Sequence, residues 1–215
     1  MMLQRTALLL FICSPLFGEE WTRGWKFSGE TEFGSGPKPN FSQFLWGDYK
    51  KSEKSRFGFA FQGRRFDYDR IVNRWEPAVG ATVFFGYKQT NSVSLFAGRT
   101  FEGKLNDGQI FTPVVASVGF KGIRVVHVFD PKFPHGDLPG TLYRKTWVGR
   151  GSIWFRAEGL HIGRGIGTEF SMWGGEVRYP FGRHFHLYWA AMYDSAQKDH
   201  NKPFVTLGGL LWSFN

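Results

Sequence analysis

Charged side chains recur at two-residue spacing within otherwise apolar segments of this chain. Glu30 and Glu32, Arg156 and Glu158, and Glu176 and Arg178 are three such pairs. On a β-strand, residues two apart point to the same face, so each pair would project to one side. Arginines collected on such a face could grip carboxylates or phosphates with two parallel hydrogen bonds. The residues predicted to line a shared, water-filled interior are Arg64, Lys88, Arg124, Arg150, Arg156, Arg178, Glu30, Glu158 and Glu176.

Metal binding and hydrolysis are two other chemistries that the residue types suggest. His184 and His186 would share a face, and His161 or Asp194 could add a ligand to a transition metal. No third ligand is fixed by spacing, so polar lining is the simpler interpretation, and we predict no metal and no cofactor. A lipid hydrolase needs a nucleophile beside a base, but no histidine is followed by serine two residues later. We therefore predict no enzyme, with a membrane-embedded lipid hydrolase as an alternative.

The elements that would carry these side chains are β-strands. Bulky and small or polar residues alternate along many segments, with one apolar face each. Aromatic residues make up 19% of the chain and there are 28 glycines, a composition typical of all-β proteins. The alternating segments span residues 25–33, 57–64, 79–88, 93–97, 110–120, 123–129, 147–157, 173–181, 185–193 and 206–214.

The first 18 residues have the pattern of a secretory signal peptide. Arg5 precedes a short apolar run, and Pro15 is followed by small and apolar residues up to Gly18. This run is too short to cross a membrane as a helix. Its removal would also remove Cys13, the single cysteine, so the remaining domain, residues 19–215, would have no disulfide.

A membrane barrel explains the alternation better than a soluble sandwich does. Several segments exceed the length of ordinary soluble strands, and aromatic residues gather at segment ends as they do at membrane interfaces. Phe59, Val83 and Trp189 should then face lipid, while the ionic residues face inward. The predicted fold is an all-β, transmembrane, antiparallel up-and-down β-barrel of about 12 strands, with 10 strands as the alternative.

The predicted connections are short at one end of the barrel and long at the other. The short turns are near 88–91, 121–122 and 182–183, and the long loops span 34–40, 67–77, 101–109, 130–145 and 195–202. Twelve strands also require a turn at Glu158–Gly159, a brief strand from Leu160 to Ile166, and a turn across 48–55. The 130–145 loop is rich in proline and glycine, and we expect it to constrict the lumen or to bind a partner.

In these features the chain resembles the Gram-negative outer-membrane β-barrel class. The class usually ends on an aromatic residue after an alternating run; here Leu210, Trp212 and Phe214 form the run, and Asn215 follows. In size and charge it is loosely similar to small oligosaccharide-specific porins of the oligogalacturonate and sialic-acid type. The resemblance implies location in the cell outer membrane. It also implies contact with outer-membrane lipid and lipopolysaccharide, and assembly by the barrel-assembly machinery.

The basic balance of the chain suggests what such a barrel would carry. Lys and Arg number 27 against 18 Asp and Glu. Our leading hypothesis is a passive channel with a basic lumen that favours small anionic solutes. The alternative is a non-conducting structural or surface-interaction barrel with a plugged lumen. Nucleic acid is not an expected partner, because the basic residues are dispersed and no reading module is evident.

Overall fold

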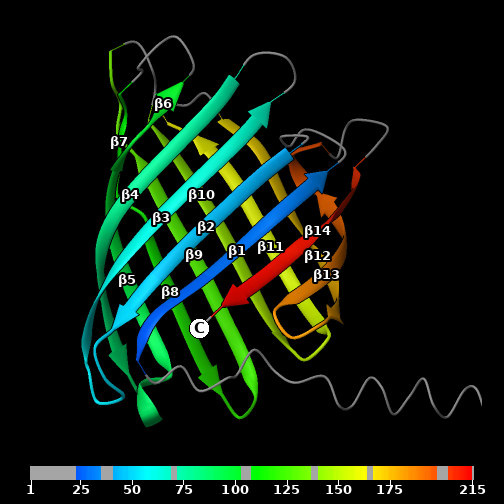
Figure 1. Cartoon of the computed structure of the whole chain (residues 1–215). Helices are drawn as coiled ribbons and strands as arrows, with labels where there is room; N and C mark the ends of the chain where they lie inside the picture. The colour runs from blue at the N-terminus through cyan, green and yellow to red at the C-terminus, as the bar shows by residue number, and fades with distance from the viewer. Residues whose placement is uncertain are drawn as a thin grey trace, which may run out of the picture.

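The alternating residues of the chain form the outer and inner faces of one antiparallel sheet, which closes on itself (Figure 1). The computed structural model describes residues 23–34, 41–68, 72–102, 108–136, 140–163, 167–197 and 203–214. Closure comes from pairing of the first strand with the last, in which Phe27 lies opposite Phe214 and Gly34 lies opposite Leu207. A closed sheet has no unpaired edge, so every strand can satisfy its backbone hydrogen bonds within the wall.

Each strand pairs with its neighbour in sequence, as an up-and-down barrel requires. Two barrel strands are interrupted, because β6 extends β5 along β4, and β7 precedes β8 between β5 and β9. The closed sheet therefore has twelve strands. The elements are β1 Gly24–Gly34, β2 Phe41–Lys50, β3 Phe57–Tyr68, β4 Val72–Phe85, β5 Asn91–Arg99, β6 Phe101–Glu102, β7 Ile110–Phe111, β8 Val114–Phe120, β9 Ile123–Lys132, β10 Thr141–Arg150, β11 Ile153–Ile162, β12 Gly167–Phe181, β13 Phe185–Asp194 and β14 Phe204–Phe214.

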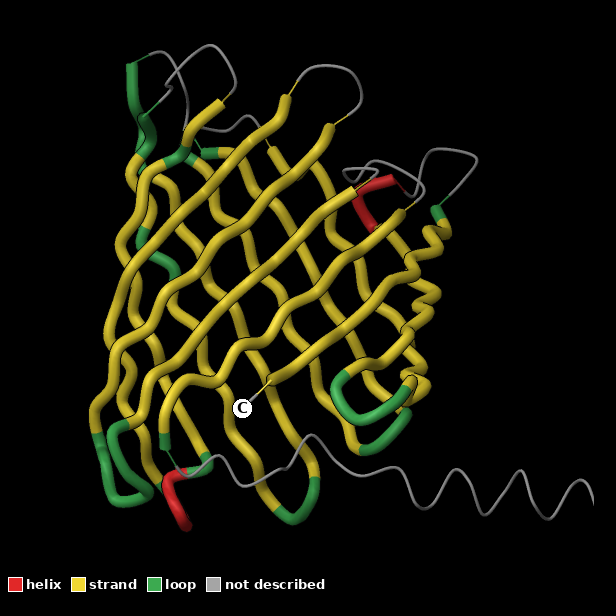
Figure 2. Tube along the Cα trace, viewed as in Figure 1, coloured by secondary structure: helices red, strands yellow, loops and turns green. Residues whose placement is uncertain are grey.

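The two ends of the barrel differ in their connections, as predicted. Short turns join β8 to β9, β10 to β11 and β12 to β13, and the three-residue 3₁₀ helix Tyr87–Gln89 lies between β4 and β5. Figure 2 shows these turns at the lower end of the barrel. The predicted signal peptide, residues 1–18, and the tips of several long connections lie outside the described residues. Among the described residues, no helix has the length and apolar character needed to span a membrane.

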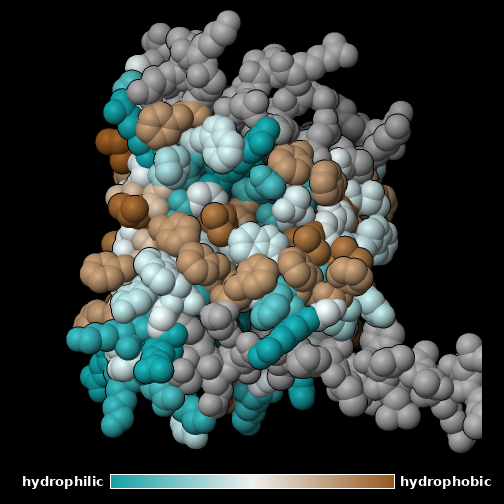
Figure 3. Space-filling model, viewed as in Figure 1, coloured by the Kyte–Doolittle hydropathy of each residue, from teal (hydrophilic) through white to brown (hydrophobic). Residues whose placement is uncertain are grey.

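The outer wall is apolar. Phe59, Val83 and Trp189, which were expected to face lipid, are 70%, 44% and 56% exposed. Figure 3 shows hydrophobic residues gathered across this face of the barrel, with hydrophilic residues at its lower edge. Large exposed apolar surfaces are rare on soluble monomers but are required where strands face acyl chains. The wall therefore has the surface of a membrane barrel, and the sequence prediction of the fold is confirmed.

One predicted turn and one predicted strand are wrong, although the strand number is unchanged. Glu158 and Gly159 lie inside β11, which runs unbroken to Ile162, and the turn lies at Gly151–Ser152. Gly151 adopts a φ of 56°, which glycine reaches without steric cost and which permits the tight turn. The alternation across 147–157 therefore belongs to two strands rather than one.

Two predicted loops are shorter than expected. The 67–77 connection narrows to residues 69–71, and β9 and β10 occupy both ends of the predicted 130–145 loop. These segments carry Glu76, Asp130 and Lys145, which the prediction placed in loops. They are strand residues that point inward, where charge is tolerated because other charges face it.

Close packing of glycine against aromatic rings holds the seam between the first and last strands. A Cβ added at Gly29 would lie 2.2 Å from the Trp212 ring and 2.8 Å from the carbonyl oxygen of Phe44. At Gly63 on β3, an added Cβ would meet nothing within 4 Å.

We predict that Gly29→Ala destabilises the barrel by roughly 1–3 kcal/mol, the usual cost of overpacking. The measurement is the temperature at which folded protein loses its shifted mobility on an unboiled SDS gel. Gly63→Ala is the matched control and should leave that temperature unchanged. Equal behaviour of the two variants would contradict the packing argument.

Candidate functional site in the barrel interior

The inward face of the wall is charged, but its two signs balance. Among residues whose side chains are described, all the acidic residues on strands point inward, as do an equal number of basic ones. The acidic residues are Glu30, Glu32, Asp48, Glu76, Asp130, Glu158, Glu176 and Asp194. The basic residues are Lys26, Lys50, Arg64, Arg124, Lys132, Lys145, Arg156 and Arg178.

Arg156 on β11 is the centre of the larger ion-pair cluster. Its guanidinium pairs with Glu32 and lies 2.7 Å from Glu158, 3.3 Å from Glu176 and 3.5 Å from Glu30. The side chain is fully buried. A buried guanidinium is stable only where carboxylates and hydrogen bonds replace its lost water, and four carboxylates do so here.

Further contacts extend the cluster around Arg156 and carry it across the barrel. Lys145 on β10 lies 2.6 Å from Glu30 on β1, and the Arg178 Nε donates to Glu176 at 2.6 Å. β10 and β1 are not neighbours in the wall, so the Lys145–Glu30 pair spans the interior. The Tyr188 hydroxyl donates to Glu32 at 2.7 Å and completes this side of the cluster.

A second cluster lies on the opposite side of the interior. Arg64 on β3 pairs with Asp130 on β9 and lies 2.9 Å from Glu76, which also pairs with Lys132. Tyr143 joins the two clusters: Arg64 lies 6.0 Å from the centroid of its ring, and its hydroxyl donates to Glu158 at 2.6 Å. Because both clusters link strands that do not pair, together they bridge the barrel. We call this set of contacts the bridging network.

Apolar side chains pack beside the bridging network. A buried group gathers on β12, β13 and β14 with Tyr143 and Leu160 beside it, and its members include Phe170, Met172, Met192, Val205 and Leu207. A smaller group, which includes Phe96 and Phe111, lies against the other part of the wall. Buried apolar and ionic side chains thus occupy this level of the interior together.

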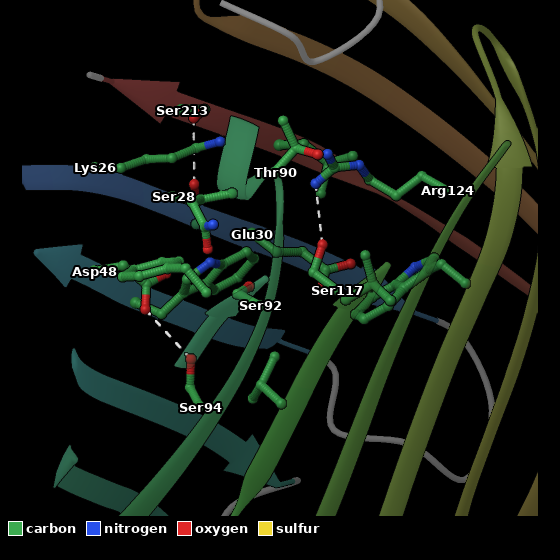
Figure 4. Close-up of a pocket in the computed structure, with 18 of the residues that line it drawn as sticks. Lys26, Ser28, Glu30, Asp48, Thr90, Ser92, Ser94, Ser117, Arg124 and Ser213 are labelled. Atoms are coloured by element: carbon green, nitrogen blue, oxygen red, sulfur yellow. Dashed lines mark hydrogen bonds between the residues drawn. The ribbon is translucent and has the colours of Figure 1, made fainter. Parts of the chain in front are cut away.

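On the short-turn side of the bridging network the interior widens into a cavity of about 650 Å³ (Figure 4). Its lining includes Glu30 and Arg178 of the network and reaches Lys54 and Lys88 in the end turns. Basic residues in the lining outnumber acidic ones by six to three. The basic ones are Lys26, Lys54, Arg56, Lys88, Arg124 and Arg178, and the acidic ones are Glu30, Asp48 and Glu53.

Hydroxyl groups and aromatic rings supply the rest of the cavity wall. Arg124 donates to the Ser117 hydroxyl at 3.0 Å, and Asp48 accepts from Thr82 at 2.8 Å and from Ser94 at 3.3 Å (Figure 4). The Arg178 guanidinium stacks 3.8 Å from the centroid of the Trp154 ring, a cation–π contact that fixes its position. The cavity therefore offers positive charge and hydrogen-bonding groups together.

The structure separates the nine predicted lining residues into groups. Arg64, Arg156 and Glu158 lie in the bridging network; Lys88 and Arg124 lie in the cavity; Glu30 and Arg178 belong to both. Glu176 is buried in the network.

The prediction that Arg150 lines the interior is wrong, because this residue lies on the outer face. Arg150 pairs with Ile153, one position out of phase with inward-facing Trp154, and its side chain is exposed. The cause is the turn at Gly151–Ser152: a single strand would have kept Arg150 in phase with Arg156, whereas the two-residue turn reverses the face.

Sequence reasoning missed several interior residues. Lys26, Lys132 and Lys145 face inward but were not predicted to do so. The alternation could have identified them if it had been followed through the polar residues. Lys145, for example, is in phase with Tyr143 and Trp147.

The paired histidines do not form a metal site in the described part of the chain. His184 lies in a turn, where its Nδ1 is 2.9 Å from the Ser213 carbonyl oxygen and its ring stacks on Phe214. His186 lies on β13 opposite Pro180. The described residues contain no group of three or more histidine, cysteine, aspartate or glutamate side chains placed to hold a metal ion.

Comparisons with known proteins find similarity in solved structures only. No family model matches the chain, and no curated protein matches it. The KdgM porin is 13% identical with a TM-score of 0.48, and the match covers 88% of this chain and 99% of that one. The same porin in complex with disordered oligogalacturonate is 12% identical with a TM-score of 0.49 and covers 88% and 99%. The Acinetobacter baumannii outer membrane protein Omp33 is 11% identical with a TM-score of 0.44 and covers 92% and 100%.

The strand pairing of this chain establishes the barrel by itself. The closed antiparallel wall, the apolar exterior and the ionic interior are those of an outer-membrane β-barrel. The place of the protein is accordingly the cell outer membrane.

We predict that Arg156→Met lowers the free energy of unfolding by about 3–5 kcal/mol, because it removes the one guanidinium that four buried carboxylates share. Urea unfolding in lipid vesicles, followed by tryptophan fluorescence, measures the change. Adding Glu32→Gln to Arg156→Met should recover part of the loss, since one uncompensated charge is removed. Arg150→Met on the outer face is the control, and a loss there as large as that of Arg156→Met would refute the role of the network.

Proposed function

We propose that this barrel is a passive outer-membrane channel for small anionic solutes, closed at mid-height by the bridging network in its resting form. The observation that carries the proposal is the cavity at the short-turn end, with its six basic residues against three acidic ones. A cleft lined by one excess sign concentrates counter-ions, and low-dielectric walls strengthen the effect. The sequence predicted an excess of basic residues along the whole lumen. In this proposal, the excess is confined to the cavity.

The bridging network sets the resistance of the proposed channel. Arg64 and Arg156 are fully buried between carboxylates of non-adjacent strands, so a solute that leaves the cavity must displace these contacts or pass beside them. Ion pairs are a reversible closure because water and a passing anion can replace the carboxylates around a guanidinium. The cavity therefore supplies selection, and the network supplies the barrier.

A non-conducting barrel is the second candidate, and the completeness of the network favours it. Contacts such as Lys145–Glu30 and Arg64–Asp130 tie opposite walls together, as they do in narrow barrels filled by side chains. The two candidates differ in one measurable property, the conductance of the unaltered protein.

We expect the unaltered protein in a planar lipid bilayer to show a reversal potential, under a salt gradient, on the anion-selective side. Replacing Lys26, Lys88 and Arg124 by glutamine would leave three basic and three acidic residues in the cavity, so the anion preference should largely disappear. The combined replacement of Arg65, Arg99 and Arg150 by glutamine removes an equal charge from the outer wall; it is the control and should leave the potential unchanged. A cation preference in the unaltered protein would overturn the proposed selectivity.

The solute class is tested by swelling of vesicles that contain the protein, with galacturonate and galactose as probes of nearly equal size. Galacturonate, which carries the carboxylate, should enter faster.

If the unaltered protein passes neither ions nor sugars while Arg156→Ala combined with Glu158→Ala conducts, the barrel is plugged in its natural form and the second candidate is correct. No enzymatic role is proposed.

We also propose how the chain reaches the outer membrane. We infer that residues 1–18 are removed during export and that residues 19–215 form the barrel, inserted by the barrel-assembly machinery. N-terminal sequencing of protein purified from outer membranes should begin at Glu19. A first residue beyond Trp25 would contradict this assignment, because it would remove part of β1.

A further inference from the structure

The outer wall carries basic side chains away from the cavity and the bridging network. Where side chains on strands are described, those that face outward include no acidic residue. The outward-facing basic residues among them are Arg65, Arg99, His127, Arg144, Arg150 and His161. The described part of the membrane-facing strand surface therefore carries basic but no acidic side chains.

Three of these residues lie together on β9, β10 and β11. The Arg144 side chain is exposed, and its Nη2 lies 2.6 Å from the Nε2 of His161. Because arginine has only donors, the His161 nitrogen accepts this bond and holds the guanidinium in place. Among the described residues, the other N–H groups of Arg144 have no hydrogen-bond partner. The Nδ1 of His127 lies 2.7 Å from the hydroxyl of Thr146, two residues along β10.

Small residues lie beside these basic groups on β11 and β8, whereas the exposed ring of Phe129 on β9 lies opposite Arg144. Arg144 is paired across the sheet with Gly159, and Thr146 is paired with Ala157. On the other side His127 is paired with Ala116. The Arg144 side chain is itself exposed, so its guanidinium is reachable from the membrane side. We call Arg144, His127 and His161 the basic strip.

An arginine on the lipid-facing wall is costly unless an anion meets it. Exposure of arginine near the middle of the membrane costs roughly 2–4 kcal/mol, falling toward the interface. Arg144 lies three residues from the long-loop end of β10 and six from its short-turn end, so it is nearer the headgroups on the long-loop side. Phosphate oxygens accept the paired N–H groups of a guanidinium well, and the bond is charge-assisted.

We propose that the basic strip binds the phosphate group of an anionic outer-membrane lipid, with Arg144 as the binding residue and His161 as its positioning residue. The proposal rests on the membrane placement argued above but not on conduction through the barrel. A second copy of the chain is a poorer occupant. A symmetric contact would set one basic strip against another, and the described outer wall has no acidic side chain on its strands to pair with it.

Native mass spectrometry of the full chain in detergent tests the proposal, with lipid A carrying two phosphates as the probe and fully dephosphorylated lipid A as its comparison. We expect the diphosphorylated form to bind more tightly. Arg144→Gln should weaken its binding about tenfold, the equivalent of one charged hydrogen bond. Arg150→Gln, at the other end of the same strand, removes the same charge and should leave binding unchanged.

Other outcomes of this experiment would overturn the lipid site. Equal binding of the two lipids, or equal losses in Arg144→Gln and Arg150→Gln, would mean that adducts form without the basic strip. A dimer that disappears in Arg144→Gln would assign the strip to a second copy. Retention of the shifted mobility on an unboiled gel shows that each variant is folded, and Arg144→Lys should bind with intermediate affinity because it keeps charge but not the paired donors. Since none of these measurements involves conductance, they remain informative if the channel proposal fails.

Discussion

Burial of charge inside a closed wall is the constraint on which this structure depends. The exterior faces acyl chains, so the ionic side chains of the strands turn inward, where there is room for them but little water. Arg156 and Arg64 have no exposed surface, and each is surrounded by carboxylates instead of solvent. Because an unpaired buried charge costs several kcal/mol, the inward charges must be matched in number and in position. The equal numbers of inward acids and bases are the result.

This pairing organises the interior into two regions with different properties. Where strands on opposite sides exchange carboxylates and guanidinium groups, as Glu30 and Lys145 do, the barrel is bridged and filled. Where they do not, the interior opens into the cavity, and its surplus basic groups face water. The hydroxyl groups of Ser92, Ser94 and Ser117 in the cavity wall suit hydrated solutes better than apolar ones. The bridging network, as the proposed barrier, and the cavity, as the proposed selecting surface, are thus formed by the same wall at different heights along the barrel axis.

The same segregation shapes the outside of the protein. Where side chains on strands are described, the acidic ones point inward, and the charged ones that face the membrane are basic. Arg144 is held by His161, and its side chain is exposed. Charge placement therefore connects the interior, which would select solutes, with the surface, which would select lipids. Neither property requires a long loop or a cofactor among the described residues.

The sequence alone determined the barrel, its strand number and its two unlike ends, because alternation and turn chemistry are local properties. It also identified Arg156, Glu158 and Glu176 as interior residues, since phase along one strand decides the face. It misplaced Arg150 because the two-residue turn at Gly151 changes that phase, and a positive φ is not visible in alternation. Only the tertiary structure decided that Lys145 meets Glu30 and Arg64 meets Asp130. Those contacts join strands that are neither neighbours in the chain nor partners in the sheet, and their distances depend on the curvature and stagger of the closed wall.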